Sequence, residues 1–169
     1  LQDEKRDDIL RFVKGALWRN FMVKYPEVNT LHKKMLKVSE KLAVVSCQSP
    51  VARKASRAPR PSLLASAFDH LYAGQCNCPY WHGIFGGIYL PHIRTANYAH
   101  LIEAETLADQ AAHGKRAWVD WEEYDFDKDS LNELLVSGSA MNLYFDLARG
   151  GTLFEWDWRA KKLNLLNTL

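Results

Sequence analysis

Residues 75–92, QCNCPYWHGIFGGIYLPH, form the stretch around which the rest of the chain is organised. Gln75, Asn77 and His82 can each donate and accept hydrogen bonds, and aromatic rings and glycines are interleaved with them. A site for a polyhydroxylated ligand needs this mixture, with rings under the C–H faces of a sugar and polar groups at its hydroxyls. The alternative is a glycine-rich turn whose rings only fill a hydrophobic core.

The composition is that of an ordinary globular chain. Of its 169 residues, 47% are hydrophobic and 25% are charged, and the net charge of +2 is too small to indicate a nucleic-acid partner. No apolar run is long enough to span a bilayer, so we expect no membrane partner. Cys76 and Cys78 are too close in sequence for a structural bridge, and the total of three cysteines is odd, which favours a reducing compartment such as the cytoplasm.

Both ends of the sequence indicate a piece of a longer protein. The chain begins at Leu1, without an initiator Met, in a charged and helix-like stretch. It ends at Leu169, directly after a strand-like run. We therefore expect a fragment, in which the absence of a targeting signal carries little information.

The first two thirds of the chain has the apolar spacing of helices. Four such segments are separated by turn signals, and they run from Ile9 to Met22, from Leu31 to Val45, from Leu64 to Tyr72 and from Ile93 to Ala111. The pair Tyr25-Pro26 is expected to end the first of them, and Gly114 the last.

Three finer predictions follow for these helices. Asn29 is a plausible N-cap for the second helix. Lys33, Lys34 and Lys37 lie off its apolar stripe and are expected on a solvated face. The buried side of the last helix is expected to hold mainly small and aliphatic residues, namely Ile93, Ala96, Leu101, Ala104, Leu107, Ala108 and Ala111.

After Gly114 the spacing changes to that of strands. The expected strands are 117–122, 134–137, 143–147, 154–158 and 163–166, with Phe154, Trp156 and Trp158 on one face. The fold class is therefore α+β, an antiparallel bundle of about four helices followed by a few antiparallel strands that look like a truncated β-sandwich. We predict a helical central domain at 1–114 and the start of a C-terminal β-sandwich domain at 115–169, whose exposed edges favour a homo-oligomer.

The cysteines of the central stretch allow two further interpretations. Cys76, Cys78 and His82 offer three soft metal ligands, but no second cysteine pair exists and the spacing is poor for zinc. A Cys–His nucleophilic pair would use Cys76 or Cys78 with His82 or His92, and sequence spacing gives it no support.

An acidic segment, DFDKDSLNE at 125–133, is a candidate Ca²⁺ site. Asp125, Asp127 and Asp129 can turn their oxygens onto one cation, and Glu133 can close the site from beyond the turn. Ser130 stands where an EF-hand loop has glycine, so the segment is not an EF-hand. A plain acidic hairpin turn is the alternative.

The central stretch closely resembles the fifth conserved region of glycoside hydrolase family 57, in its 4-α-glucanotransferase and α-amylase branch. The match departs from that branch at Cys78-Pro79. Two other segments agree, because residues 20–35 resemble the helical central domain of that branch, and residues 142–145 with 150–155 resemble the start of its C-terminal β-sandwich. The resemblance covers nearly the whole chain.

The resemblance implies a complete enzyme with a (β/α)7 barrel that cleaves α-1,4-glucans with retention of configuration. Its Glu nucleophile and Asp acid/base would precede Leu1, so this chain alone would lack the catalytic pair. The central stretch would reach the active-site cleft, where Trp81 would be a sugar platform. His82, Gln75, Asn77 and Tyr80 would hydrogen-bond the maltooligosaccharide or support the loop.

Three functions therefore remain after the sequence alone. The first is the non-catalytic central region of an α-glucan-active hydrolase or glucanotransferase, which contributes a substrate-binding loop and needs no cofactor, with Ca²⁺ as the one candidate ion. The second is a free-standing helical carbohydrate-binding or protein-interaction module. The third is a small metalloprotein that uses Cys76, Cys78 and His82.

Overall fold

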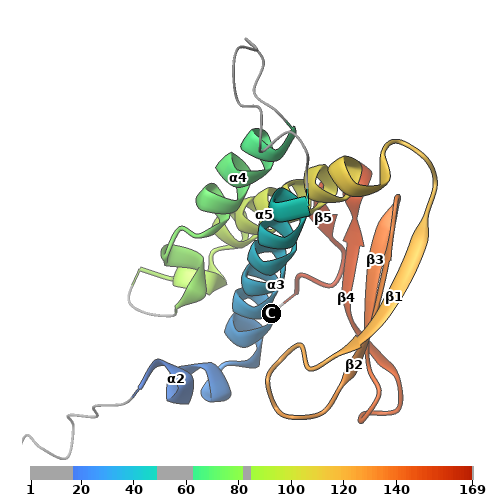
Figure 1. Cartoon of the computed structure of the whole chain (residues 1–169). Helices are drawn as coiled ribbons and strands as arrows, with labels where there is room; N and C mark the ends of the chain where they lie inside the picture. The colour runs from blue at the N-terminus through green and yellow to red at the C-terminus, as the bar shows by residue number, and fades with distance from the viewer. Residues whose placement is uncertain (1–16, 49–62, 82–84, 169) are drawn as a thin grey trace, which may run out of the picture.

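The computed structural model describes residues 17–48, 63–81 and 85–168. Helices come first and strands follow, so the predicted α+β class is confirmed (Figure 1). The helices are α2 (Trp18–Lys24), α3 (Pro26–Gln48), α4 (Leu63–Gly74) and α5 (Pro91–His113), and the short 3₁₀ turns are η2 (Cys78–Tyr80), η3 (Gly87–Tyr89) and η4 (Arg159–Lys161). The strands are β1 (Val119–Tyr124), β2 (Glu133–Gly138), β3 (Met141–Asp146), β4 (Thr152–Trp158) and β5 (Leu163–Asn164).

The break between α2 and α3 lies at Tyr25, as the sequence predicts. The prediction that Asn29 caps α3 is wrong, because α3 already begins at Pro26. Proline suits the first helical position, since its missing N–H has no partner there in any helix. Asn29 lies inside the helix instead, and its amide donates a hydrogen bond to the backbone carbonyl of Asp127 at 3.1 Å.

Helices α3, α4 and α5 pack around an apolar core. Gly74 allows the close approach of α4 and α5, because a Cβ atom at this position would lie 2.6 Å from a methyl carbon of Leu101. The fully buried members of the core include Val28, Leu31, Val38, Leu42, Ala67, Leu71, Leu101, Ile102, Ala104 and Ala108.

One side of α5 differs from the expectation. Ala96 and Ala111, which were predicted to be buried, are exposed. The buried residues of α5 include four polar ones instead, Arg94, Asn97, Glu105 and Asp109. The spacing argument fails here because the polar side chains of α5 have buried partners. Glu105 and Asp109 meet Lys34 and Arg159. Arg94 and Asn97 bind Ile88 and Tyr80 in the segment that precedes α5.

The strands form one antiparallel meander in the order β1-β2-β3-β4-β5. Its register is shifted between Tyr144 and Phe145, because Tyr144 pairs with Glu155 while Phe145 pairs with Leu153. Phe154 is therefore the extra residue of a β-bulge. The prediction that Phe154, Trp156 and Trp158 share a face is wrong for Phe154, whose ring packs against Phe126 and Tyr144.

The helices cover one face of the sheet and leave the other uncovered (Figure 1). We call the covered face the inner face and the uncovered one the outer face. The inner face carries the buried polar residues Asn142, Glu155 and Asp157 beside a small apolar cluster of Phe126, Leu135 and Tyr144, against which Tyr124 and Phe154 pack. The register places one apolar row on four neighbouring strands of the outer face, made of Trp121, Val136, Leu143 and Trp156.

Lys34 joins the helices to the inner face. The prediction that it lies on a solvated face is wrong, because its exposed fraction is 0%. Its Nζ atom lies 2.6 Å from Asp157 Oδ2 on β4 and 2.9 Å from Glu105 Oε2 on α5. It also donates a hydrogen bond to the hydroxyl of Tyr144 at 3.2 Å. Lys34 lies off the apolar stripe of α3, and it is buried because Glu105 of α5 and Asp157 of β4 bind its ammonium group.

The ions around Lys34 form a connected buried cluster. Lys41 reaches Glu105 Oε1 at 2.6 Å, and Arg159 reaches Asp109 Oδ2 at 2.6 Å. The amide of Asn142 donates to Glu105 and to Asp157, at 2.8 and 3.1 Å. Burial opposes the charge on Glu105, but Lys34, Lys41 and Arg159 outweigh it and hold the pKa of that carboxyl well below its usual range.

Glu155 is the exception in this cluster. Its exposed fraction is 0%, neither of its carboxyl oxygens has a hydrogen-bond partner, and Lys34 Nζ lies 3.8 Å away. Burial and then the negative charge of Asp157 raise its pKa well above the usual range of a glutamate. With Glu155 protonated, three cations (Lys34, Lys41, Arg159) face three anions (Glu105, Asp109, Asp157), so the cluster is neutral.

Candidate functional site

The central stretch forms the loop that connects α4 to α5, and Gln75, Asn77 and Trp81 lie in it. Two of the predicted glycines act as turn residues, because Gly86 and Gly87 have φ values of 96° and 52°, which favour glycine. A side chain at Gly86 would also meet Leu90 at 2.7 Å. Glycine is therefore required at both of these turn positions.

Tyr80 fixes the first half of the loop to the helices. It is buried, and its hydroxyl donates a hydrogen bond to the backbone carbonyl of Gly74. The same oxygen accepts a hydrogen bond from the amide of Asn97 on α5, at 2.9 Å. Burial raises the pKa of Tyr80, so the phenol keeps the proton that it donates. The structure thus gives Tyr80 a supporting position beneath the loop.

Arg94 fixes the second half of the loop. One of its terminal nitrogens donates to the backbone carbonyl of Ile88 at 2.6 Å. Its Nε atom donates to the side chain of Asn167, which follows the last strand. Asn167 also donates to the hydroxyl of Thr95 at 3.3 Å. One arginine of α5 therefore connects the loop with the end of the sheet region.

A pocket of about 350 Å³ opens between this loop and helices α2 and α3. Four of the predicted binding residues line it, Gln75, Asn77, Tyr80 and Trp81. Trp81 keeps 36% of its surface exposed, and Gln75 and Asn77 are exposed as well. The fifth predicted residue, His82, lies outside the described residues.

The pocket also contains residues that the sequence did not identify as a site. Trp18 of α2 and His32 and Met35 of α3 line it. Gln75 connects the two walls, because its amide lies 3.8 Å from the sulfur of Met35. One sequence signal was available, since His32 and Met35 are three positions apart and so share a helix face. Nothing in the sequence indicated that this face meets the central loop.

None of the described residues that line this pocket is Asp or Glu. The buried carboxylates of Glu105 and Asp157 bind Lys34 within the helix–sheet interface instead. A pair of carboxylates is the usual requirement for cleavage of a glycosidic bond. The described pocket can therefore bind and orient a ligand, and it holds no acid–base pair of its own.

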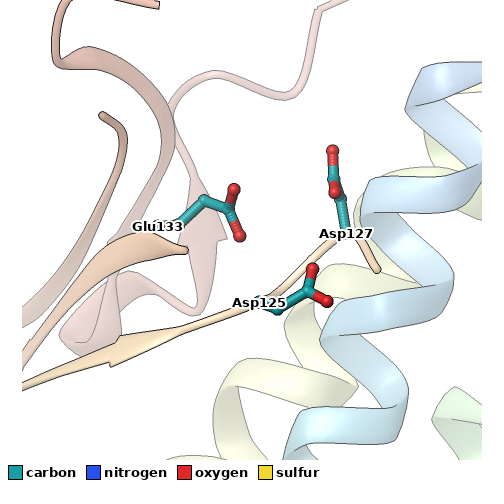
Figure 2. Close-up of side chains that lie close together, drawn as sticks. All are labelled: Asp125, Asp127 and Glu133. Atoms are coloured by element: carbon teal, nitrogen blue, oxygen red, sulfur yellow. The ribbon is translucent and has the colours of Figure 1, made fainter. Parts of the chain in front are cut away.

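The acidic segment forms the turn between β1 and β2, beside helix α3 (Figure 2). One oxygen each of Asp125, Asp127 and Glu133 lie within 4.8 Å of one another. Asp129, the fourth predicted ligand, does not belong to this group. The pKa values of Asp127 and Glu133 are raised, mainly by burial and then by the charges of the neighbouring carboxylates.

The turn also uses its acidic side chains for its own backbone. Asp127 accepts a hydrogen bond from the N–H of Asp129, and Asp129 accepts one from Leu131, at 3.0 and 2.8 Å. Glu133 accepts one from the N–H of Phe126 at 2.6 Å. Oδ1 of Asp125 is buried without a partner. The arrangement fits both earlier interpretations, a cation site and a plain acidic turn.

The cysteines form no bridge in the part of the chain that the structure describes. Cys47, Cys76 and Cys78 are free and exposed. Among the described residues, the one group of His, Cys, Asp and Glu side chains close enough to share a metal ion is the acidic one, and it contains no cysteine. None of the described helices is both long and apolar enough to cross a membrane.

Comparison with known proteins identifies the class of this region. A family model described as the middle domain of α-amylase/4-α-glucanotransferase matches residues 16–108. A second one, described as the C-terminal region of the same enzymes, matches residues 125–169. The chain belongs to the α-amylase/4-α-glucanotransferase family, which confirms the resemblance found in the sequence.

Individual relatives agree with this family. The chain is 39% identical over 163 residues to α-amylase 1 of Dictyoglomus thermophilum, covering 96% of this chain and 21% of the relative. It is 33% identical over 170 residues to a 4-α-glucanotransferase of Thermococcus kodakarensis, covering 100% of this chain and 22% of the relative. The chain thus spans about a fifth of the length of these relatives.

The fold has a counterpart among solved structures. The crystal structure of 4-α-glucanotransferase from Thermococcus litoralis matches with a TM-score of 0.71 and 30% sequence identity. The match covers 99% of this chain and 22% of that one. Helices and sheet therefore occur together in this arrangement within a much larger enzyme.

Proposed function

We propose that this chain is the non-catalytic central region of a retaining α-glucan-active enzyme, and that its α4–α5 loop contributes a wall to the substrate cleft. The observation that carries the proposal is the pocket that gathers Trp81, Gln75 and Asn77 over the buried Tyr80. Rings for the apolar faces of a sugar and amides for its hydroxyls are the required chemistry. The relatives named as α-amylases and 4-α-glucanotransferases supply the ligand class, an α-1,4-glucan or maltooligosaccharide.

Each residue has a separate role in this proposal. Trp81 is the sugar platform, because its indole is partly exposed in the pocket. Gln75 and Asn77 bind hydroxyl groups, since their exposed amides offer both donors and acceptors. Tyr80 supports the loop through Gly74 and Asn97. His82, for which the structure gives no position, keeps its predicted part in hydroxyl binding.

The catalytic Glu and Asp belong to a (β/α)7 barrel of the same protein in this proposal. The absence of carboxylates from the described lining of the pocket supports that division of roles. We place the helical central domain at residues 1–114 and the start of the C-terminal β-sandwich domain at 115–169. The cytoplasm remains the predicted compartment, on the odd number of cysteines.

The test compares the complete protein with its Trp81→Ala variant. We expect the variant to bind maltoheptaose roughly tenfold or more weakly, which corresponds to a contact of about 1.4 kcal/mol. Tyr72→Ala is the matched control, because Tyr72 is an exposed ring on α4 outside the pocket. Equal affinities of the Trp81 variant and the parent in calorimetric titration would exclude the proposed platform.

A second measurement tests the non-catalytic role. The purified 169-residue chain should neither hydrolyse maltooligosaccharides nor transfer their glucosyl units, as measured by chromatography of the products. Turnover by this chain alone would show that its catalytic carboxylates lie within it. Glucan binding without turnover by a naturally free-standing chain would favour the alternative of a binding module.

A further inference from the structure

The pocket has a second wall besides the central loop, and residues of α2 and α3 form it. Trp18 and His32 line the same cavity as Trp81. Trp18 keeps 47% of its surface exposed. A large ring that is held at a cavity and left open to it provides a flat apolar face for a ligand.

The orientation of Trp18 is set by its neighbours. Its indole stacks on Phe21, with ring centroids 5.0 Å apart and an interplanar angle of 18°. Phe21 in turn contacts Tyr25, with centroids 4.8 Å apart. This series of rings positions the indole before any ligand arrives, and a pre-positioned ring loses little conformational freedom on binding.

His32 lies between the two walls. Its ring meets Trp18 edge-on at 6.4 Å and Tyr80 edge-on at 6.0 Å. Its Nδ1 atom is buried without a hydrogen-bond partner, so Nε2 is the ring nitrogen that remains for the pocket. Burial and then the charge of Lys33 lower the pKa of His32, so the ring is neutral near neutral pH.

We propose that Trp18 and His32 bind the same stretch of glucan as Trp81, Trp18 by stacking on a glucosyl ring and His32 by a hydrogen bond from Nε2 to a hydroxyl group. The proposal rests on the proposed function, from which it takes the ligand class. The pocket, at about 350 Å³, lies at the lower end of the range for small-molecule sites, about 300–1,000 Å³. It therefore fits a short stretch of glucan rather than a whole chain.

The experiment measures maltoheptaose binding to the complete protein by calorimetry. Trp18→Ala and His32→Phe should each raise the dissociation constant about fivefold to tenfold, the upper value corresponding to about 1.4 kcal/mol. His32→Phe keeps an aromatic ring against Trp18 and Tyr80 and removes both ring nitrogens, and thermal unfolding of the variant checks that the fold tolerates the larger ring. Tyr72→Ala again serves as the control with unchanged binding.

A direct readout separates ligand contact from a structural role. In protein labelled with 5-fluorotryptophan, the fluorine resonance of Trp18, identified by its loss in Trp18→Phe, should shift on addition of maltoheptaose. If Trp81→Ala weakens binding while this resonance does not move and His32→Phe binds like the parent, the present proposal is overturned and the proposed function stands. If Trp81→Ala also binds like the parent, the proposed function fails and this proposal fails with it.

Discussion

The β-sheet directs buried polar and charged side chains, beside a small apolar cluster, toward the helices and turns a row of apolar residues away from them. An antiparallel sheet with one covered face usually does the reverse, with apolar residues on the covered face and polar ones toward water. Here the inner face presents Asn142, Glu155 and Asp157 to α3 and α5. The outer face carries Trp121 and Trp156 in one apolar row.

The two faces differ in the partners that their side chains require. On the inner face, Asp157 meets Lys34 of α3 and the amide of Asn142 on β3, so this charge has its partners within the described residues. The outer face has the character of a sandwich interior, where two sheets interdigitate apolar side chains. It supports our proposal that residues 115–169 start a β-sandwich domain.

The largest expected effect comes from breaking the inner face at its centre. Lys34→Met should lower the free energy of unfolding by about 3–5 kcal/mol, because it leaves Asp157 and Glu105 buried without their shared cation. Lys33→Met is the control, since Lys33 is only half-buried and should change stability by no more than about 0.5 kcal/mol. Urea unfolding of both variants measures the difference, and equal midpoints would mean that the cluster does not hold the face.

The second prediction concerns the proton on Glu155. Its folded pKa is raised above the unfolded value of 4.5, so the stability it contributes is complete below that value and is lost as the pH rises toward the folded pKa. Over that range the unfolding free energy of the parent should fall relative to Glu155→Gln, by up to about 1.4 kcal/mol per pH unit. If the unfolding free energies of the two proteins change equally with pH over this range, Glu155 is already charged in the folded protein and the prediction is wrong.

The third prediction concerns the apolar row of the outer face. If two copies of the 169-residue chain associate through the outer face rather than through the predicted sheet edges, Trp156→Lys should weaken that association about tenfold, since it places a charge in the apolar row. Because the side chain is only 37% exposed, the variant also loses buried apolar contact, and urea unfolding should show a lower unfolding free energy than that of the parent. Sedimentation velocity measures the association, with Tyr72→Lys as the matched control. An equal loss in the control would place the contact elsewhere.

The smallest effect is expected at the acidic turn where β1 leads into β2. Without divalent ions, Asp127→Asn should raise stability by up to about 0.5 kcal/mol, because it removes one of three carboxylates within 4.8 Å. If the turn binds Ca²⁺, millimolar Ca²⁺ should raise the melting temperature of the parent and leave that of the variant unchanged. The same shift in both proteins would favour the plain acidic turn.

Helical spacing and strand alternation predicted the element order and the fold class, because the local pattern alone determines them. The β-bulge at Phe154 was not predictable, since an inserted residue is recognised only from the pairing of Tyr144 with Glu155. The burial of Lys34 was missed for a related reason. A cation is placed in a core by partners far away in sequence, here Glu105 and Asp157.

The candidate site shows the same limit. The central stretch indicated a sugar-binding site from its sequence alone, because Trp81, Gln75 and Asn77 lie close together in it. Trp18 and His32 read as ordinary helix residues, and only the packing of α2 and α3 beside the loop brings them to the pocket.

Arg94 has a consequence for how this region can be divided. It binds Ile88 in the loop and Asn167 after the last strand. Any boundary drawn between helices and strands therefore separates two partners of one side chain. Removing the residues after Asn164, for crystallisation or for transplanting the helices onto another scaffold, would remove Asn167 and leave Arg94 with Ile88 as its remaining partner of the two.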